Sequence, residues 1–211
     1  SGESAPDYAG NSVIRTSRYS MLDNYEVVIE NSLIYDLDVN RFFDVLAGFK
    51  GTMADRITIT DSTFSEISGA VLKLDAETDD LGIYNADYVT IRGSSFSNIQ
   101  GPLVALYRGG TDESTFGPHF AMTESHVTNV GNGTKNKSGA SIFLHGVQVT
   151  EIAENTVIQS APLVINHTVG EPRTRVLMNR FDGKGYVEVK EINSQKKNTA
   201  LVSGNLLLSG E

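Results

Sequence analysis

A short motif recurs at nearly constant intervals along the chain, and this repeat restricts the fold more than any other feature. Each copy reads apolar residue, two residues, serine or asparagine, one residue, apolar residue. We call the central serine or asparagine the anchor. A weaker copy has Gly204 at this position, and the full copies place their anchors at Ser32, Ser62, Ser94, Ser125, Asn155 and Asn179. Intervals of 30, 32, 31, 30, 24 and 25 residues indicate a solenoid of stacked units.

The residues before each anchor alternate between apolar and polar, which is the period of a β-strand. The alternating apolar pairs are Val27/Ile29, Ile57/Ile59, Val89/Ile91 and Phe120/Met122. A second strand follows a glycine, or in the last copy an alanine, in residues 69–75, 101–107, 139–145 and 161–167. Because one short strand cannot bury its apolar side alone, successive units must stack. We expect the anchors to form an internal hydrogen-bonded ladder at the bend after the first strand, with an apolar stack just beyond it. We predict an all-β chain folded as a right-handed parallel β-helix of about seven rungs. A sandwich of aligned sheets is the alternative, but it does not explain so regular a register.

The domain organisation follows from where the repeat begins. We expect residues 1–24 to form an N-terminal lead-in or an irregular first rung, and residues 25–211 to form a single β-helix domain. The opening segment "SGESAPDYAG" lacks the features of a signal peptide, and its first two residues resemble a cloning remnant. Such an opening is typical of a domain taken from a longer protein.

The charge balance argues against several classes of partner. The chain has 26 acidic and 17 basic residues, a net charge of -9, and no run rich in lysine and arginine, which is unfavourable for binding nucleic acid. It has no cysteine, so disulfides and thiolate metal sites are excluded. No apolar run approaches the roughly 20 residues of a membrane helix. We therefore expect neither nucleic acid nor a membrane as a partner.

Alternation along the second strand predicts which of its side chains point outward. The predicted inward positions are Leu72, Val104, Ile142 and Val164, followed by Leu74, Leu106, Leu144 and Asn166. The predicted outward face is then unusually apolar, which is typical of a partner surface. We predict a domain interface on this face, formed by Leu103, Ala105, Phe143, Leu163 and Ile165. Alternatively, a loop or terminus of the same chain covers it.

One edge of the same face is predicted to be polar. The outward residues there are Asp75, Tyr107, His145 and His167, and the long loop of residues 107–120 adds Arg108 and His119. Long ordered loops often carry function, and a guanidinium binds a carboxylate bidentately. We predict a substrate-binding surface formed by Tyr107, Arg108, His119, His145 and His167. The simpler interpretations are strand-end polarity for each residue, and pairing of Arg108 with Asp112 or Glu113 in its own loop.

An acidic run, "DAETDD" in residues 75–80, offers oxygen ligands of the kind that Ca²⁺ binds. It lacks the spacing of an EF-hand loop, so we interpret it as an acidic surface turn and assign no metal site to it.

Two longer stretches carry a resemblance to a known family. At "LYRGGTDESTFGPHF" and "SGASIFLHGVQVTEIAENT", the chain resembles the C-terminal β-helix domain of bacterial alginate lyases of polysaccharide lyase family 6, the group that includes chondroitinase B. The resemblance extends from about Tyr25 to Phe181. It implies a secreted or periplasmic bacterial protein and an acidic polysaccharide, alginate, as a partner.

The resemblance also implies a chemistry. Members of this family cleave uronate polysaccharides by β-elimination: a lysine removes the C5 proton, an arginine assists, and in many members calcium neutralises the carboxylate. In two-domain members these groups lie on the N-terminal β-helix. This chain has no match to the family's asparagine/glutamate calcium cluster or to its lysine and arginine motifs. We therefore assign no catalytic residue, metal ligand or cofactor here, and expect calcium only in a full-length enzyme.

Four hypotheses follow. The preferred one is a non-catalytic accessory domain that packs against the N-terminal catalytic β-helix of the same polypeptide and helps complete the substrate cleft. The second is a β-eliminating lyase active on its own, with Lys73 and Arg108 as base and charge stabiliser. The third is a carbohydrate-binding module that uses Tyr107, Phe143 and Phe116 as aromatic contacts. The fourth is a structural or adhesive solenoid, because fold alone does not specify function.

Overall fold

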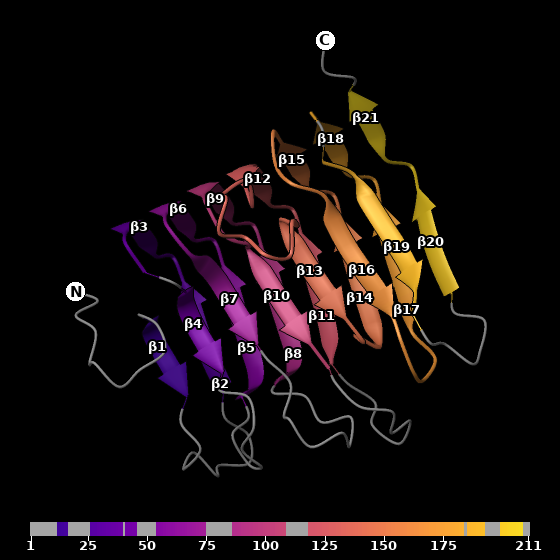
Figure 1. Ribbon diagram of the computed structural model, residues 1–211, viewed down its shortest axis with the longest axis horizontal. Helices are drawn as coiled ribbons and strands as arrows, with labels where there is room; N and C mark the ends of the chain where they lie inside the picture. The colour runs from indigo at the N-terminus through magenta and orange to yellow at the C-terminus, as the bar shows by residue number, and fades with distance from the viewer. Residues whose placement is uncertain are drawn as a thin grey trace.

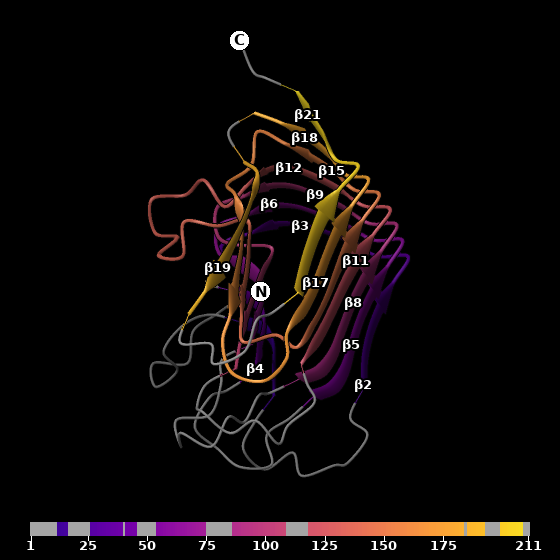
Figure 2. The same ribbon diagram turned by 90° about the vertical axis from the view of Figure 1, so that its right-hand side faces the viewer.

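The computed structural model describes residues 12–16, 26–39, 41–45, 54–74, 86–108, 118–183, 185–192 and 199–208. The regular elements in these residues are 21 strands, arranged in three parallel sheets of seven (Figures 1 and 2). Each coil of the chain contributes one strand to each sheet, so that seven coils follow one another along the long axis. The predicted parallel β-helix is confirmed. No helix capable of crossing a membrane occurs in the described segments.

The three sheets can be followed by their strand labels. The first sheet contains β1 (Ser12–Thr16), β4 (Arg41–Val45), β7 (Ala70–Leu74), β10 (Val104–Tyr107), β13 (Ile142–His145), β16 (Leu163–His167) and β19 (Val187–Glu191). The second contains β2 (Glu26–Glu30), β5 (Ala54–Thr60), β8 (Ala86–Arg92), β11 (His119–Thr123), β14 (Val149–Ala153), β17 (Arg173–Leu177) and β20 (Thr199–Ser203). The third contains β3 (Leu33–Leu37), β6 (Thr63–Ile67), β9 (Ser95–Ile99), β12 (His126–Val130), β15 (Thr156–Ile158), β18 (Arg180–Asp182) and β21 (Leu206–Leu208).

The anchors form a single file at the bend between the second and third sheets. The backbone N–H of Ser94 donates to Ser125 Oγ at 3.2 Å, and the N–H of Ser125 donates to Asn155 Oδ1 at 2.9 Å. The same link joins every successive pair of anchors from Ser32 to Asn179. Each anchor thereby satisfies a buried donor of the preceding coil, which would otherwise destabilise the fold.

The last anchor is Asn205, not Gly204 as the sequence pattern predicted. The N–H of Asn179 donates to Asn205 Oδ1 at 2.9 Å. Gly204 instead holds the position before the anchor, where the backbone has a positive φ of 67°. Every coil needs a left-handed residue there, and non-glycine residues fill it at Asn31, Asp61, Glu124, Glu154 and Met178. The glycine is therefore a bend residue, and the anchor follows it.

Beyond the anchors, apolar side chains stack along the interior of the third sheet. Phe64 and Phe96 are fully buried, and their rings stack at a centroid distance of 5.4 Å. Val127, Val157 and Phe181 continue this buried column in register. The column confirms the prediction of an apolar stack just past the anchors.

The predicted register of the first sheet is wrong at its fourth repeat. Leu163 of β16 pairs with Ile142 of β13, and Ile165 pairs with Leu144. Both residues therefore point into the core, where Leu163 is 0% and Ile165 1% exposed, and Val164 takes the outward position. Leu163 follows Ala161 by two residues, whereas the equivalent Leu72, Val104 and Ile142 follow Gly69, Gly101 and Gly139 by three. Because residues 163–165 are all apolar, alternation did not fix their phase.

The apolar outer face is consequently smaller than predicted. Leu103 precedes β10 and is fully buried, as is Val71 of β7. Of the residues assigned to a domain interface, Leu103, Leu163 and Ile165 thus belong to the core, where an interface with another domain cannot reach them. Only Ala105 and Phe143 face outward, and both are half-buried.

Candidate functional site

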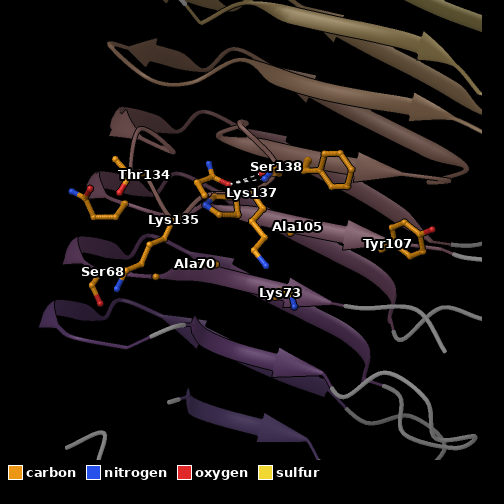
Figure 3. A pocket seen from close by; sticks show the side chains of 16 residues that line it. Ser68, Ala70, Lys73, Ala105, Tyr107, Thr134, Lys135, Lys137 and Ser138 are labelled. Atoms are coloured by element: carbon orange, nitrogen blue, oxygen red, sulfur yellow. Dashed lines mark hydrogen bonds between the residues drawn. The ribbon is translucent and has the colours of Figure 1, made fainter. Parts of the chain in front are cut away.

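A groove of about 820 Å³ lies on the outer side of the first sheet. Its floor is formed by strands β7, β10 and β13, and one wall is the loop of residues 131–139, which projects beyond the sheet (Figures 2 and 3). Tyr107 lies at the end of the groove nearest the carboxyl ends of the strands. The volume is in the range of small-ligand sites in proteins.

The floor is built by one outward column of the sheet. Lys73, Ala105 and Phe143 occupy equivalent positions on adjacent strands. Their neighbours Leu72 and Leu74 point into the core, so alternation directs Lys73 outward. Since Ala105 is small, the floor between Lys73 and Phe143 is low, and this makes the hollow.

The wall is a loop held in place by its own polar groups. Asn136 Nδ2 donates to the carbonyl oxygens of Gly131 at 2.7 Å and Ala140 at 2.9 Å, while Asn136 Oδ1 accepts from Ser138 Oγ at 2.7 Å. The N–H of Gly133 donates to the Gln100 carbonyl of the neighbouring coil at 2.9 Å. The backbone around residue 136 is therefore fixed before any ligand arrives.

Two lysines flank this fixed asparagine. Lys135 extends toward Ser68 and Ala70, and Lys137 extends over the floor toward Ala105 and Lys73 (Figure 3). The lining contains three lysines and no aspartate or glutamate among the described residues. On a chain of net charge -9, this is a locally cationic site. Such a site attracts anions even when the whole molecule repels them.

An aromatic row borders the groove. The rings of Tyr107 and His145 stack at 4.4 Å and 12°, and the rings of Phe143 and His145 lie 6.2 Å apart. Asn166 Nδ2 lies 3.3 Å from His145 Nδ1 and, being an amide donor, requires that nitrogen to accept. Burial lowers the pKa of His145 below its ordinary value. The imidazole is therefore neutral at pH 7 and presents an apolar ring face beside Tyr107.

Two of the predicted site residues are buried instead of facing a ligand. Arg108 follows β10 and is 1% exposed, so its predicted role at the surface is wrong. Its alternative partners, Asp112 and Glu113, lie outside the described residues, as do Asp75 and Phe116. Arg108 takes the inward phase that follows buried Leu106 and outward Tyr107, and its backbone N–H donates to the His145 carbonyl at 2.9 Å.

His167 is the second buried residue. Because of the register of β16, it is 0% exposed, and the prediction that it faces outward is wrong. Its Nδ1 lies 3.0 Å from Glu191 Oε1 and its Nε2 lies 2.8 Å from Thr174 Oγ1. This order of carboxylate, imidazole and hydroxyl is that of a hydrolase triad. Thr174 is only 1% exposed, however, so the series links β16, β17 and β19 and does not meet a substrate.

His119 lies on a different side of the molecule. It belongs to β11 of the second sheet, whereas Tyr107 and His145 belong to the first. The structure thus brings together Tyr107 and His145 and separates His119 from them. Lys135 and Lys137 were not among the predicted site residues, although they form a polar insertion with two lysines in an otherwise acidic chain.

The described residues contain no cluster of three or more histidine, aspartate or glutamate side chains suited to a metal ion. The acidic run of residues 75–80 is outside that part of the chain. The groove can therefore bind an anion through its lysines and a ring through its aromatic row.

Comparison with known proteins gives one clear relationship. The chain is similar to the structure of a PL6 family alginate lyase, AlyGC, determined for a point mutant: identity is 44% and the TM-score 0.87, covering 96% of this chain and 28% of that chain. A second structure of AlyGC gives the same identity and coverage with a TM-score of 0.85. No protein-family model and no curated protein sequence matches. The chain is therefore related to a PL6 family alginate lyase and spans about 28% of its length.

Proposed function

We propose that this chain is a non-catalytic, accessory β-helix of an alginate lyase-type polysaccharide lyase, and that its lysine-lined groove holds a segment of acidic polysaccharide. The observation that carries the proposal is the groove itself, with Lys135 and Lys137 on its wall and no carboxylate among its described lining residues. The 44% identity to an alginate lyase supplies the class of polymer.

The groove chemistry suits a polyuronate. Each sugar of such a polymer carries one carboxylate, which an ammonium group attracts, and one flat C–H face, which packs on an aromatic ring. Both kinds of side chain line the groove: Lys73 and Phe143 on the floor, and Tyr107 at one end. A neutral polysaccharide would use only the aromatic contacts, so the lysines favour an acidic one.

The accessory role is favoured over independent catalysis. The alternative of a self-sufficient lyase required Lys73 and Arg108 to act together on one sugar. Arg108 is 1% exposed and cannot approach a polymer in this conformation. In our proposal the β-elimination chemistry, with any calcium, belongs to the N-terminal domain of a secreted or periplasmic enzyme in which this chain is the C-terminal domain.

A second occupant of the same face is the catalytic domain. Ala105 and Phe143 point outward and are half-buried, and apolar outward residues suit an interface between domains. The remaining apolar surface is small, however, because Leu103, Leu163 and Ile165 are buried. We therefore place polysaccharide, and not the catalytic domain, in the groove.

Calorimetric titration of alginate oligosaccharides into the chain tests the proposal. We expect the double substitution Lys135→Glu and Lys137→Glu to weaken binding about tenfold, because two attractions become two repulsions. The matched control is Lys190→Gln, which removes an exposed charge from the outer side of β19, away from the groove. We expect its affinity to stay within about twofold of the parent.

Two results would contradict the proposal. Unchanged affinity in the double variant would remove the groove as the site. Formation of unsaturated sugar by the chain alone, followed by ultraviolet absorbance at stoichiometric protein, would show that it is catalytic.

A further inference from the structure

A second row of charged and aromatic residues lies on the outer side of the second sheet. Arg56, Tyr88, His119, Val149 and Arg173 occupy one register column on β5, β8, β11, β14 and β17. We call these residues the Arg56–Arg173 row. Because adjacent strands lie about 4.8 Å apart, the row extends for about 19 Å along the molecule.

The strands fix the outward direction of the row. The next residue on each strand, including Ile57, Val89 and Phe120, is buried in the core, so alternation points the row toward solvent. Tyr88 is 43% and Val149 39% exposed, and both arginines are exposed. The exposed parts of Tyr88 and Val149 form a larger apolar surface than is usual on a strand that faces water.

Tyr88 is held in a fixed orientation by its neighbours. Arg56 Cζ lies 5.3 Å from the centroid of the Tyr88 ring, and the His119 ring meets the Tyr88 ring edge-on at 4.8 Å and 66°. A ring that is clamped between a cation and an imidazole loses little entropy when a ligand packs on it. The row therefore offers a preorganised aromatic platform with a guanidinium at each end.

The charge of the row is complementary to an anion. No carboxylate occurs in the column between Arg56 and Arg173. Glu26 precedes Arg56 in the same column, and Glu151 lies two residues along β14 from Val149. These carboxylates border the row on one end and one side, and they leave the line from Arg56 to Arg173 open to a long ligand.

We propose that the Arg56–Arg173 row is a second binding site for acidic polysaccharide, separate from the groove on the first sheet. A sugar ring packs on Tyr88 and Val149, and carboxylates further along the same polymer pair with Arg56 and Arg173 through bidentate hydrogen bonds. The identity of the polymer rests on the proposed function, whereas the site rests on its own charges and rings. The carboxylate-binding role that the sequence assigned to Arg108 passes here to arginines that solvent can reach.

The length of the row makes a specific demand on the ligand. A disaccharide is too short to reach both guanidinium groups, whereas a hexasaccharide can span them. Engagement of both ends by one molecule raises the apparent affinity without any new kind of contact. Affinity at the row must therefore rise steeply with oligosaccharide length.

Calorimetry with an alginate hexasaccharide tests the second site. We expect two hexasaccharide sites per chain. The double substitution Arg56→Ala with Arg173→Ala should leave only the groove, with the affinity that the groove has in the parent. Tyr88→Ala alone should weaken the row about fivefold. The matched control is Arg180→Ala, which removes an exposed arginine from the third sheet and should leave both sites within about twofold. Circular dichroism confirms that each variant is folded.

Different results would overturn the groove on the first sheet and the Arg56–Arg173 row on the second. If the groove variant Lys135→Glu with Lys137→Glu still binds one hexasaccharide, and Arg56→Ala with Arg173→Ala removes that binding, the row is established whether or not the groove binds sugar. A single-site isotherm for the parent that the arginine substitutions leave unchanged would overturn the row and leave the groove proposal standing. Equal affinity for disaccharide and hexasaccharide at the row would likewise overturn it.

Discussion

At the scale of single residues, one side-chain oxygen per coil connects each coil to the next. Serine serves in the first four anchors and asparagine in the last three, and both present an oxygen to the buried N–H of the preceding anchor. A serine anchor donates its hydroxyl to a carbonyl of its own coil, as Ser125 Oγ does to Thr123 at 2.8 Å, whereas Asn155 Nδ2 donates to the Met122 carbonyl of the preceding coil at 2.9 Å. The change from serine to asparagine thus strengthens the ladder where the coils become shorter.

His145 makes a prediction at the same scale. Burial lowers its pKa in the folded chain, so on acidification through pH 6.5 the unfolded chain takes up the proton first. The free energy of unfolding must therefore fall between about pH 7.5 and pH 5, and His145→Gln must lack that part of the decrease. Urea unfolding of both proteins at the two pH values measures it. An identical decrease in the two proteins would show that His145 is not responsible.

At the scale of elements, the loop of residues 131–139 links packing to binding. Asn136→Ala removes its two bonds to backbone carbonyls but keeps both lysines. We expect about threefold to tenfold weaker oligosaccharide binding, because the lysines must then be ordered on binding. Tyr35→Phe, an exposed change on β3 of the third sheet, is the control and should have no effect. Faster hydrogen exchange confined to residues 131–139 would accompany the loss; parent-like affinity would contradict a preorganised wall.

The elements also show what the sequence could predict. Alternation and the anchor spacing predicted the strands, the ladder and the buried aromatic stack, because these follow from a period that repeats in every coil. Phe143, Ala105, Tyr107 and His145 were correctly placed on one outer face for the same reason. Leu163 and Ile165 were misplaced because an unbroken apolar run does not show which of its residues point inward. The lysine wall has no counterpart in other coils, so periodicity contained no information about it.

At the scale of the whole molecule, the stacked coils place two different anion-binding chemistries on two sides. The groove on the first sheet uses lysines around a hollow, and the Arg56–Arg173 row on the second sheet uses guanidinium groups around an exposed ring. Each depends on strands far apart in sequence lying in register, which only the coiled stack provides. A polymer is long enough to contact many coils, so a solenoid is a suitable scaffold for it.

Amide chemical-shift mapping of the chain during titration with an alginate hexasaccharide tests whether the groove on the first sheet binds acidic polysaccharide. We expect saturable shifts in residues 131–139 and in the amides of Lys73, Ala105 and Phe143, which together enclose the groove. The hexasaccharide concentration at half-saturation should increase as salt is raised, because the attraction is electrostatic. A titration that reaches saturation without shifting these amide signals would show that the polysaccharide does not bind in the groove.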